Sequence, residues 1–391
     1  MGRRQKGDGC VYWSSSKKLW VAQYNEGYDE NGKLIKRTIY SKSKDEINKK
    51  LKEIQYMQLN GTYIERNGIT LAELIDSIRE NKYKANIIGH QQYARLKTTA
   101  NKIKKNGLSL KKVQDIKAYD IQNFLNDNIE LSDSYLSKIM EVLNGAFKKA
   151  IKLRIIKDNP MEDIIKPKSK TEQKEIRALT LEEQTAFTKY LKNSTIEENR
   201  FKVCFLIEMY MGLRIGEVLA LNSNDVNFKE GYIKITKTLT KDIHGNVMMG
   251  NTTKTFAGKR IVPIPDTIKE EVKEQVKLSK NNKDNLLFTI NNNYVKGNTV
   301  NYELKQIFTN MLEMSADEIS THVLRHTFAT RCIEGGMSPV ALQRLMGHTD
   351  ISITLNTYTS VFNRYKEEEI NKVNKYLSKK VFNEKTEEIE Y

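Results

Sequence analysis

The chain has 391 residues, which is enough for two or three domains with separate cores. Three widely spaced cysteines without a CxxC pair argue against a disulfide framework or a zinc ribbon and favour the cytoplasm. No run of 18 apolar residues occurs, which argues against a membrane span. The net charge is +16, of which residues 1–170 hold +14 (34 basic and 20 acidic side chains). This distribution fits either an N-terminal part that binds phosphate groups or a lysine-rich chain whose charges solvate its helices.

The first sixty residues predict a three-stranded sheet followed by one helix, and the N-terminus lacks the apolar core of a signal peptide. Aromatic and β-branched residues predict strands at 11–13, 19–24 and 36–40. Asp29–Gly32 has the composition of a hairpin turn before the last of these strands. Residues 45–59 carry apolar side chains at helical spacing, so one helix would cover the sheet.

The basic and aromatic side chains of this sheet allow two interpretations. Lys33, Lys36 and Arg37 beside aromatic residues would suit a DNA groove. Trp13 and Trp20 could instead fill the core of a small domain. For the two tryptophans we favour the core.

Residues 69–160 read as helix throughout. Amphipathic spacing of apolar residues predicts four helices, which are Thr70–Asn81, Ile88–Asn106, Asp120–Asn128 and Ser132–Leu153. Asn159-Pro160 closes this block, because the residue before a proline is disfavoured in a helix. The polar stretch Lys166–Lys170 that follows is the best linker in the sequence.

A third block begins with a capping box at Thr180–Glu183 and continues through an apolar helix at Phe201–Tyr210. Residues 231–265 change to a strand pattern, and from His322 onward the pattern is helical again. The whole therefore predicts a multidomain α+β chain. It combines a small three-stranded sheet with one helix, an all-α domain, and a mainly α domain with a small antiparallel sheet.

Six polar residues of the third block form a set suited to breaking a phosphodiester bond without a metal. A tyrosine that attacks phosphorus must lose its proton, the transition state gathers charge on non-bridging oxygens, and the departing 5′ oxygen needs a proton. Arginines, histidines, a lysine and a tyrosine supply all of these functions. The candidate catalytic residues are Arg214, Lys254, His322, Arg325, His348 and Tyr358.

Each of these residues has an expected role. Arg214 and Arg325 would bind the non-bridging oxygens bidentately. Lys254, between two strand patterns, would protonate the leaving oxygen, and Tyr358 would attack. His322 lies three residues before Arg325, so one helix face would present both.

His348 and His322 would act as hydrogen-bonding groups or as bases. Taken alone, His348 could be an ordinary residue at a helix end, and Arg214 could be a surface or ion-paired arginine. Tyr358 is one of 19 tyrosines, so its identity depends on its context. The joint order and spacing make a chance match very unlikely.

Metal binding is disfavoured as an alternative. His322 and His326 are spaced like two metal ligands on one helix, but Val323 stands where a zinc site of the HExxH type has its glutamate. We expect neither a metal ion nor another cofactor.

The motifs around these residues resemble those of the tyrosine recombinases of the phage and conjugative-transposon integrase family. In order over about 145 residues, they are Gly212–Glu217, His322–His326, Leu345–His348 and Asn356–Tyr358. The resemblance implies Lys254 as the catalytic lysine, although Lys259 lies close by. It implies that Glu217, which belongs to the first motif, helps to hold the active site.

The resemblance also implies the domains and their partners. Residues 1–62 would be an AP2-like domain that binds arm-type DNA sites, residues 63–165 a helical, SAM-like domain that binds the core site, and residues 175–391 the catalytic domain. The implied partners are double-stranded DNA at core and arm sites, three further copies of the chain in a homotetramer, and a host DNA-bending protein and an excisionase. The enzyme would work in the cytoplasm, associated with the nucleoid.

The implied activity is site-specific recombination through a 3′-phosphotyrosyl bond, without ATP or metal, for integration and excision of a mobile element. A type IB topoisomerase-like enzyme uses the same chemistry, but the arm-type N-terminal domain favours a recombinase. A catalytically silent DNA-binding regulator would have no use for the full set of six residues. A predicted C-terminal helix, Tyr365–Phe382, would dock either on a neighbouring protomer or on its own domain.

Overall fold

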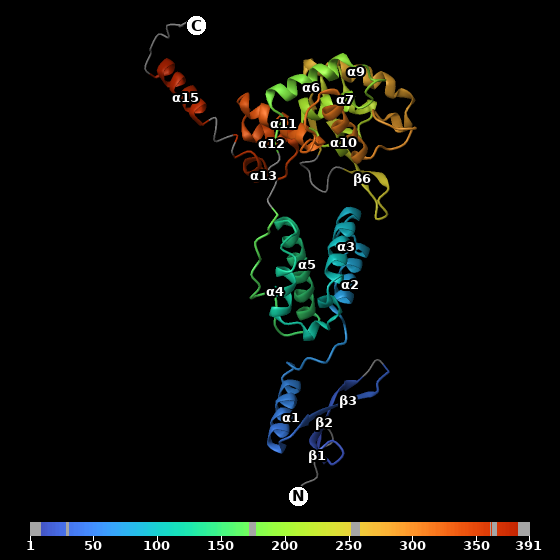
Figure 1. Cartoon of the computed structure of the whole chain (residues 1–391), viewed down its shortest axis with the longest axis vertical. Coiled ribbons are helices and arrows are strands. Elements are labelled where there is room, and N and C mark those ends of the chain that lie inside the picture. Colours follow the sequence, from blue (N-terminus) through green and yellow to red (C-terminus); the bar gives the residue numbers. More distant parts are fainter. Residues whose placement is uncertain are drawn as a thin grey trace. The chain divides into compact units, whose positions relative to one another are not determined.

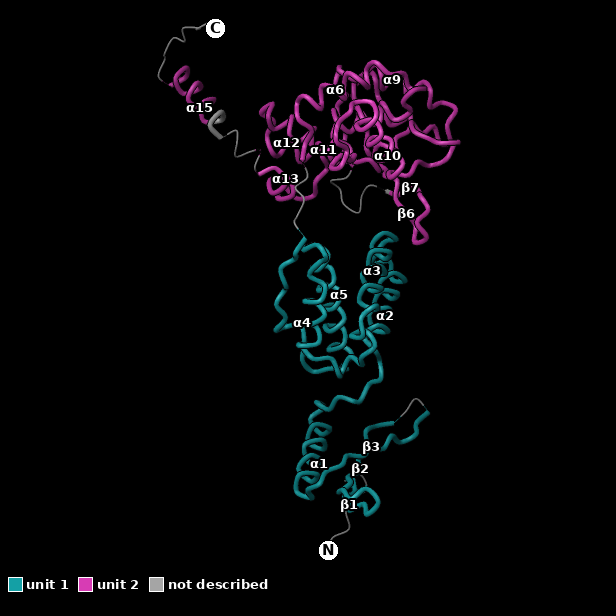
Figure 2. The backbone as a smooth tube through the Cα atoms, viewed as in Figure 1, with its two compact units in different colours: residues 1–173 teal, residues 174–391 magenta. Residues whose placement is uncertain are grey.

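The computed structural model describes residues 9–28, 31–171, 177–251, 259–359, 361 and 366–381. The chain divides into two compact units, residues 1–173 and 174–391 (Figure 2). Within the described residues, no helix combines the length and apolar character that a membrane crossing requires. The mixed α and β composition predicted from the sequence is confirmed, with small antiparallel sheets and a mostly helical second unit (Figure 1).

The first unit opens with the predicted sheet and helix. The sheet is antiparallel in the order β1-β2-β3, and one helix follows it. The strands are β1 (Cys10–Ser14), β2 (Leu19–Tyr28) and β3 (Leu34–Ser41), and the helix is α1 (Lys44–Leu59). Ala22, Ile47 and Leu51 form its buried core. The turn expected at Asp29–Gly32 lies partly outside the described residues.

The interpretation of both tryptophans as core residues is only half right. Trp20 packs against the buried cluster, whereas Trp13 is 47% exposed. The two rings meet edge to face with centroids 5.6 Å apart. The domain is too small to enclose both rings, because its buried cluster contains just one short layer of side chains between α1 and the sheet.

Four helices follow in the first unit, at the positions that the apolar spacing predicts to within a few residues. They are α2 (Leu71–Lys84), α3 (His90–Lys104), α4 (Ala118–Asn126) and α5 (Asp133–Lys152), with 3₁₀ turns at Gly107–Leu110 and Val113–Asp115. Phe124 and Phe147 lie in their common core. Thr70 and Glu73 cap α2 reciprocally, which satisfies backbone N–H groups at its start.

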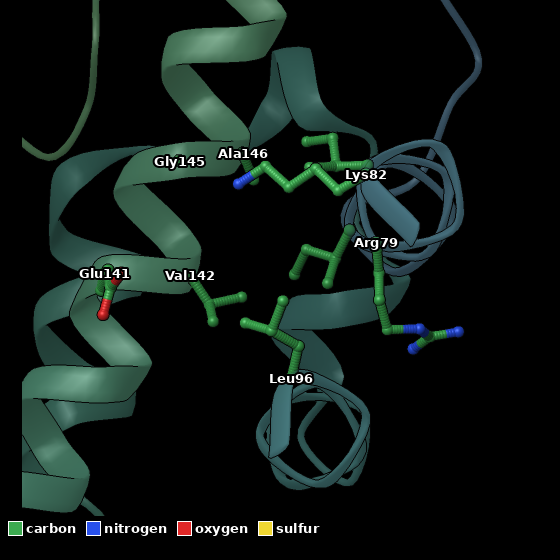
Figure 3. Close-up of a pocket in the computed structure, with 9 residues that line it drawn as sticks. Arg79, Lys82, Leu96, Glu141, Val142, Gly145 and Ala146 are labelled. Carbon is green, nitrogen blue, oxygen red and sulfur yellow. The ribbon is translucent and has the colours of Figure 1, made fainter. Parts of the chain in front are cut away.

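A pocket of about 60 Å³ opens among α2, α3 and α5 (Figure 3). Apolar side chains such as Ile75, Leu96 and Val142 line most of it, with Arg79 and Glu141 at its margins. A volume of this size holds a few water molecules.

The second unit contains one large core, in which α7 is central. Its helices are α6 (Leu181–Asn193), α7 (Lys202–Met211), α8 (Ile215–Val218), α9 (Lys269–Leu278), α10 (Gly297–Gln306), α11 (Thr321–Glu334), α12 (Pro339–Met346), α13 (Ile351–Thr357) and α15 (Lys366–Lys380). Nearly every side chain of α7 is buried, as its uniformly apolar sequence predicts. The chain bends past α10 through a π-helical turn at Ile307–Met311.

The strand pattern predicted between residues 231 and 265 is confirmed as two small antiparallel sheets. One has the order β4-β5-β8 and the other is the hairpin β6–β7; their strands are β4 (Val226–Asn227), β5 (Tyr232–Ile235), β6 (Lys237–Lys241), β7 (Val247–Asn251) and β8 (Arg260–Pro263). Short 3₁₀ turns lie at Ser223–Asp225, Asp266–Ile268, Ser279–Asn281 and Lys283–Asn285.

Helix α15 confirms the helix predicted at the C-terminal end, although Tyr365 and Phe382 lie outside the described residues. Its apolar residues Ile370, Val373 and Tyr376 are exposed in this single chain, at 60%, 51% and 64%.

Candidate active site

Arg214 is placed by the abrupt end of α7. Gly212 ends that helix in the left-handed conformation, with φ of 68°, and a Cβ there would lie 2.2 Å from the ring of Phe328 on α11. Glycine therefore permits both the turn and the close approach of α11. Arg214 follows as the residue that precedes α8, with its side chain 39% exposed. Its Nη2 donates a hydrogen bond to the Gly347 carbonyl at 3.2 Å.

Glu217 is a buried carboxylate that holds two arginines. It accepts hydrogen bonds from the backbone N–H and Nη1 of Arg214, both at 3.0 Å. It also accepts two from Arg260, at 3.0 and 2.7 Å, in a bidentate pair. Burial alone would raise the pKa of Glu217, but the hydrogen bonds and charge of Arg260, together with Arg214, lower it to about 2. The carboxylate is therefore ionised at neutral pH and fixes both guanidinium groups.

Arg260, the first residue of β8, is itself nearly buried, with 6% of its side chain exposed. Its Nε donates to the Leu345 carbonyl at 2.7 Å. Gly347 lies against its guanidinium with φ of 62°, and a Cβ at that position would be 2.8 Å from Nη1. Arg260 thus joins β8 to the end of α12, and Glu217 links this junction to Arg214.

Arg325 on α11 is anchored at several points. It donates hydrogen bonds to the carbonyls of Gly212 and Met346 and to Nε2 of His348, the last at 3.1 Å. Burial, followed by the charge of Arg214, lowers the pKa of Arg325 to about 9, which leaves the group cationic at neutral pH. Arg325 and Arg214 therefore donate to the consecutive carbonyls of Met346 and Gly347, which brings the two guanidinium groups close together. We call Arg214, Glu217, Arg260 and Arg325 the arginine pocket.

His348 has a defined tautomer in this arrangement. A guanidinium group only donates, so Nε2 of His348 must accept the hydrogen bond from Arg325. Burial, helped by the charges of Arg325 and two further arginines, lowers the pKa of His348 to about 4, so the ring is neutral. The ring proton then sits on Nδ1 and is donated to Oγ1 of Thr354 at 2.8 Å. Both nitrogens of His348 are therefore engaged.

His322 lies one turn before Arg325 on α11, as the spacing predicts. Burial, followed by the charges of Arg325 and Arg214, lowers the pKa of His322.

Tyr358 ends α13 and is almost completely buried, with 3% exposed. It packs in a small apolar cluster with Ala329, Ile333, Leu342 and Met346. The hydroxyl lies 2.8 Å from Nδ1 of His326. Burial raises the pKa of Tyr358 and the charge of Arg325 lowers it, with a net increase, so the phenol keeps its proton in the free protein.

Five of the six candidate residues thus come together in the second unit. Arg325 is at the centre: it is hydrogen-bonded to His348 and interacts electrostatically with Arg214, His322 and Tyr358. The sixth, Lys254, lies outside the described residues. Lys259, at the edge of the described segment, is exposed. No group of three potential metal ligands occurs among the side chains that the structure describes.

Three residues of this site have no role predicted from the sequence. Arg260 falls within the strand pattern of residues 231–265, and no local spacing connects it to Glu217, 43 residues away. Thr354, the partner of His348, carries no motif of its own. His326 was weighed only as half of a metal-binding pair. The i, i+4 spacing of His322 and His326 could have suggested that His326 lies on the same face of α11 as the candidate residue His322.

Residues 167–364 match the model of the phage integrase family. A protein described as "Tyrosine recombinase XerC-like" from Caldanaerobacter subterraneus subsp. tengcongensis is 27% identical, and the alignment covers 93% of this chain and 97% of the relative. A fragment of the Tn1549 transposon integrase in complex with a circular intermediate DNA has a TM-score of 0.66 and 21% identity, and the alignment covers 78% of this chain and 100% of the fragment. A lambda integrase tetramer bound to a Holliday junction has a TM-score of 0.53 and 17% identity, with 87% and 95% covered. These two likenesses show the fold.

Proposed function

Because the chain belongs to the phage integrase family, we propose that it is a site-specific recombinase that cuts and rejoins DNA to integrate and excise a mobile element. The relative named a tyrosine recombinase, which aligns over nearly its whole length, supports this function. So does the likeness to a transposon integrase that was solved with circular intermediate DNA. The observation that carries the proposal is the convergence of Arg214, Arg325 and His348 at the end of α12, where Met346 belongs to the apolar cluster of Tyr358.

The arginine pocket would bind the scissile phosphate. Arg214 keeps part of its guanidinium exposed while Glu217 and the Gly347 carbonyl fix its orientation. Arg325 is oriented by the carbonyls that it contacts. Donors held in place before the reaction stabilise the charge that develops on non-bridging oxygens at little reorganisation cost.

Tyr358 would be the nucleophile. Its Oη forms a bond to phosphorus, the bond from phosphorus to the 5′ oxygen breaks, and a 3′-phosphotyrosyl link remains with a free 5′-hydroxyl. Lys254 would supply the proton that the leaving 5′ oxygen takes up. Attack by a 5′-hydroxyl of a partner duplex reverses these bond changes and exchanges the strands. The energy of the broken bond is kept in the phosphotyrosyl link, so the reaction needs no ATP.

The remaining parts of the chain would bind and assemble DNA. Residues 1–62 would form the arm-binding domain, residues 63–165 the core-binding domain, and residues 175–391 the catalytic domain. The net charge of +14 on residues 1–170 suits phosphate contacts in the first two. A homotetramer on two DNA sites is the expected active assembly, supported by the likeness to the lambda integrase tetramer on a Holliday junction. A host DNA-bending protein and an excisionase would assist it in the cytoplasm, at the nucleoid.

Covalent capture tests the nucleophile. Tyr358→Phe should bind the DNA site with unchanged affinity but leave no protein–DNA adduct on a denaturing gel. Tyr210→Phe is the matched control: it also removes one phenolic hydroxyl of the same unit, there bonded to Thr188 at 3.0 Å, and it should form the adduct as the unmodified protein does. An adduct that persists in Tyr358→Phe would contradict the proposal.

A sulfur leaving group tests the role of Lys254. Lys254→Ala should cleave a substrate with a 5′-phosphorothiolate bond at nearly the normal rate, because a thiolate leaves without being protonated. With the ordinary oxygen substrate the same variant should be slowed about 100-fold or more. Equal impairment on both substrates would exclude Lys254 as the proton donor. If Lys259→Ala, and not Lys254→Ala, gives the selective defect, the role belongs to Lys259.

A further inference from the structure

We propose that His326 is the proton acceptor for Tyr358, a catalytic role that rests on the proposed function and adds a seventh residue to the site. The Nδ1 atom of His326 lies 2.8 Å from the Tyr358 hydroxyl, the atom that would attack phosphorus. The rings are tilted by 51° with centroids 5.5 Å apart, so they meet through this hydrogen bond and do not stack. A general base has to stand at this distance from the proton that it removes.

The other histidines of the site are placed for different tasks. His348 accepts a hydrogen bond from Arg325 at Nε2 and donates from Nδ1 to Thr354, so accepting a proton would break its contact with Arg325. His322 interacts electrostatically with Arg325, Arg214 and His326, whereas the Tyr358 hydroxyl is bonded to His326. Among the described residues, His326 is the histidine whose ring nitrogen is hydrogen-bonded to the Tyr358 hydroxyl.

In the resting protein the pair consists of a neutral imidazole and a protonated phenol. Burial, with help from His322 and Arg325, lowers the pKa of His326 to about 4, so the ring is neutral and offers a lone pair at neutral pH. Burial raises the pKa of Tyr358, so the phenol still has a proton to give. With the ring proton on Nε2, the phenol donates to Nδ1.

DNA binding would strengthen this base when it is needed. A phosphodiester in the arginine pocket brings a negative charge beside Arg325, the cation that acts on both His326 and Tyr358. An added negative charge favours the imidazolium form and so raises the pKa of His326. The free protein therefore keeps a weak base next to a neutral phenol. The bound substrate strengthens that base, although the same charge does not make the phenol more acidic.

Each proton that moves during cleavage moves back during rejoining. As the bond between Oη and phosphorus forms and the bond to the 5′ oxygen breaks, the Tyr358 proton moves to Nδ1 of His326, and Lys254 gives its proton to the leaving oxygen. In the rejoining step the 5′-hydroxyl loses its proton to Lys254, and the imidazolium returns its proton to the departing phenolate. The same histidine thus serves as base and then as acid.

The test combines His326→Asn with an acidic nucleophile. Asparagine places an amide oxygen near the position of Nδ1, so it can accept the hydrogen bond but cannot take the proton. In single-turnover cleavage, with all DNA bound, His326→Asn and His326→Ala should both be slowed about 100-fold or more. A fluorinated tyrosine at position 358, whose phenol loses its proton more easily, should restore most of that loss in both variants. Because the restoration is a ratio within each variant, a partly misfolded fraction does not affect it.

Cys332→Ala controls for packing, because Cys332 contacts the same apolar cluster and takes no part in the hydrogen bond. It should cleave at the normal rate. A normal rate in His326→Asn would overturn the proposal, because a hydrogen-bond acceptor alone would then suffice. Failure of the fluorinated tyrosine to restore cleavage would overturn it as well, because the proton would then leave by another route. Failure of the proposed function looks different: the unmodified protein itself would form no Tyr358 adduct.

Discussion

The arginine pocket and the cluster around Tyr358 lie in the same unit, but they are held together in different ways. In the pocket, a buried carboxylate and four backbone carbonyls fix three guanidinium groups; the carbonyls are those of Gly212, Leu345, Met346 and Gly347. Tyr358 is held by a small apolar cluster and one hydrogen bond to His326. The phosphate site is therefore built before substrate arrives, whereas Tyr358 is positioned by apolar packing and by the side-chain contact through which it would lose its proton.

The largest effect is expected from a change that breaks the pocket. Arg325→Lys keeps the positive charge but cannot reproduce the contacts to two carbonyls and to His348. Single-turnover cleavage should fall by about 10²–10³-fold or more, the loss typical of one oriented donor to a developing oxyanion. Thermal unfolding should also show a destabilised protein, unlike in Tyr358→Phe, which loses one hydrogen bond worth about 1 kcal/mol. Comparable stability losses in the two variants would remove the contrast between the regions.

The next effect comes from the carboxylate at the centre of the pocket. Removing one partner of a buried ion pair leaves the other charge uncompensated, so Arg260→Met or Glu217→Gln should each lower the free energy of unfolding by about 3–5 kcal/mol. The double variant should lose much less than the two single losses added together, because the only charge that it leaves without its partner is that of the partly exposed Arg214. Urea unfolding of all four proteins measures this coupling. Strictly additive losses would mean that Glu217 and Arg260 do not act as one unit.

A smaller effect isolates the contact between Gly347 and Arg260. Gly347→Ala imposes a left-handed conformation on an alanine, at about 1 kcal/mol, and places its Cβ 2.8 Å from Arg260. Cleavage should fall along with stability, because Arg260 must shift. Gly231→Ala is the control: φ there is 71° but the Cβ would meet nothing within 4 Å. It should show the conformational cost with normal cleavage, and equal cleavage in the two variants would count against a role for Arg260.

The smallest effect is a dependence of stability on pH. The pKa values of His326 and His348 are about 4 in the folded chain and 6.5 in the unfolded chain, so above pH 6.5 both rings are neutral in either state and contribute no slope. As the pH falls from 6.5 toward 4, the unfolded chain takes up protons that the folded chain does not, and the free energy of unfolding falls. Discounted for partial exposure to solvent, the loss is about 1 kcal/mol for each histidine. Urea unfolding at two pH values, one within and one above this window, measures the loss. His326→Asn should reduce the slope without abolishing it, because His348 and His322, whose pKa is also lowered, still contribute. A slope of the opposite sign would contradict the burial of these rings in neutral form.

The sequence predicts the elements of this protein well because their signals are local. Apolar spacing places α5 and the uniformly apolar α7 almost to the residue, and a capping box marks the start of α6. The exposure of Trp13 was missed, since the size of a core depends on how the elements pack and not on residue type.

In the site, the motifs single out residues by type and order but not by contact. That Arg260 joins the pocket depends on the pairing of β8 with β5 and on the approach of α12, neither of which is encoded near residue 260. The hydrogen bond of Tyr358 to His326 likewise joins two residues that are 32 positions apart in the chain. Long-range contacts of this kind need the fold.

The identity of the residue that becomes linked to DNA tests the central claim most directly. The protein is trapped on a nicked site, digested with protease and nuclease, and the peptide that carries the nucleotide is sequenced by mass spectrometry. The account predicts a single modified residue among the 19 tyrosines, Tyr358. A nucleotide attached to any other residue would mean that the arginine pocket serves a different nucleophile.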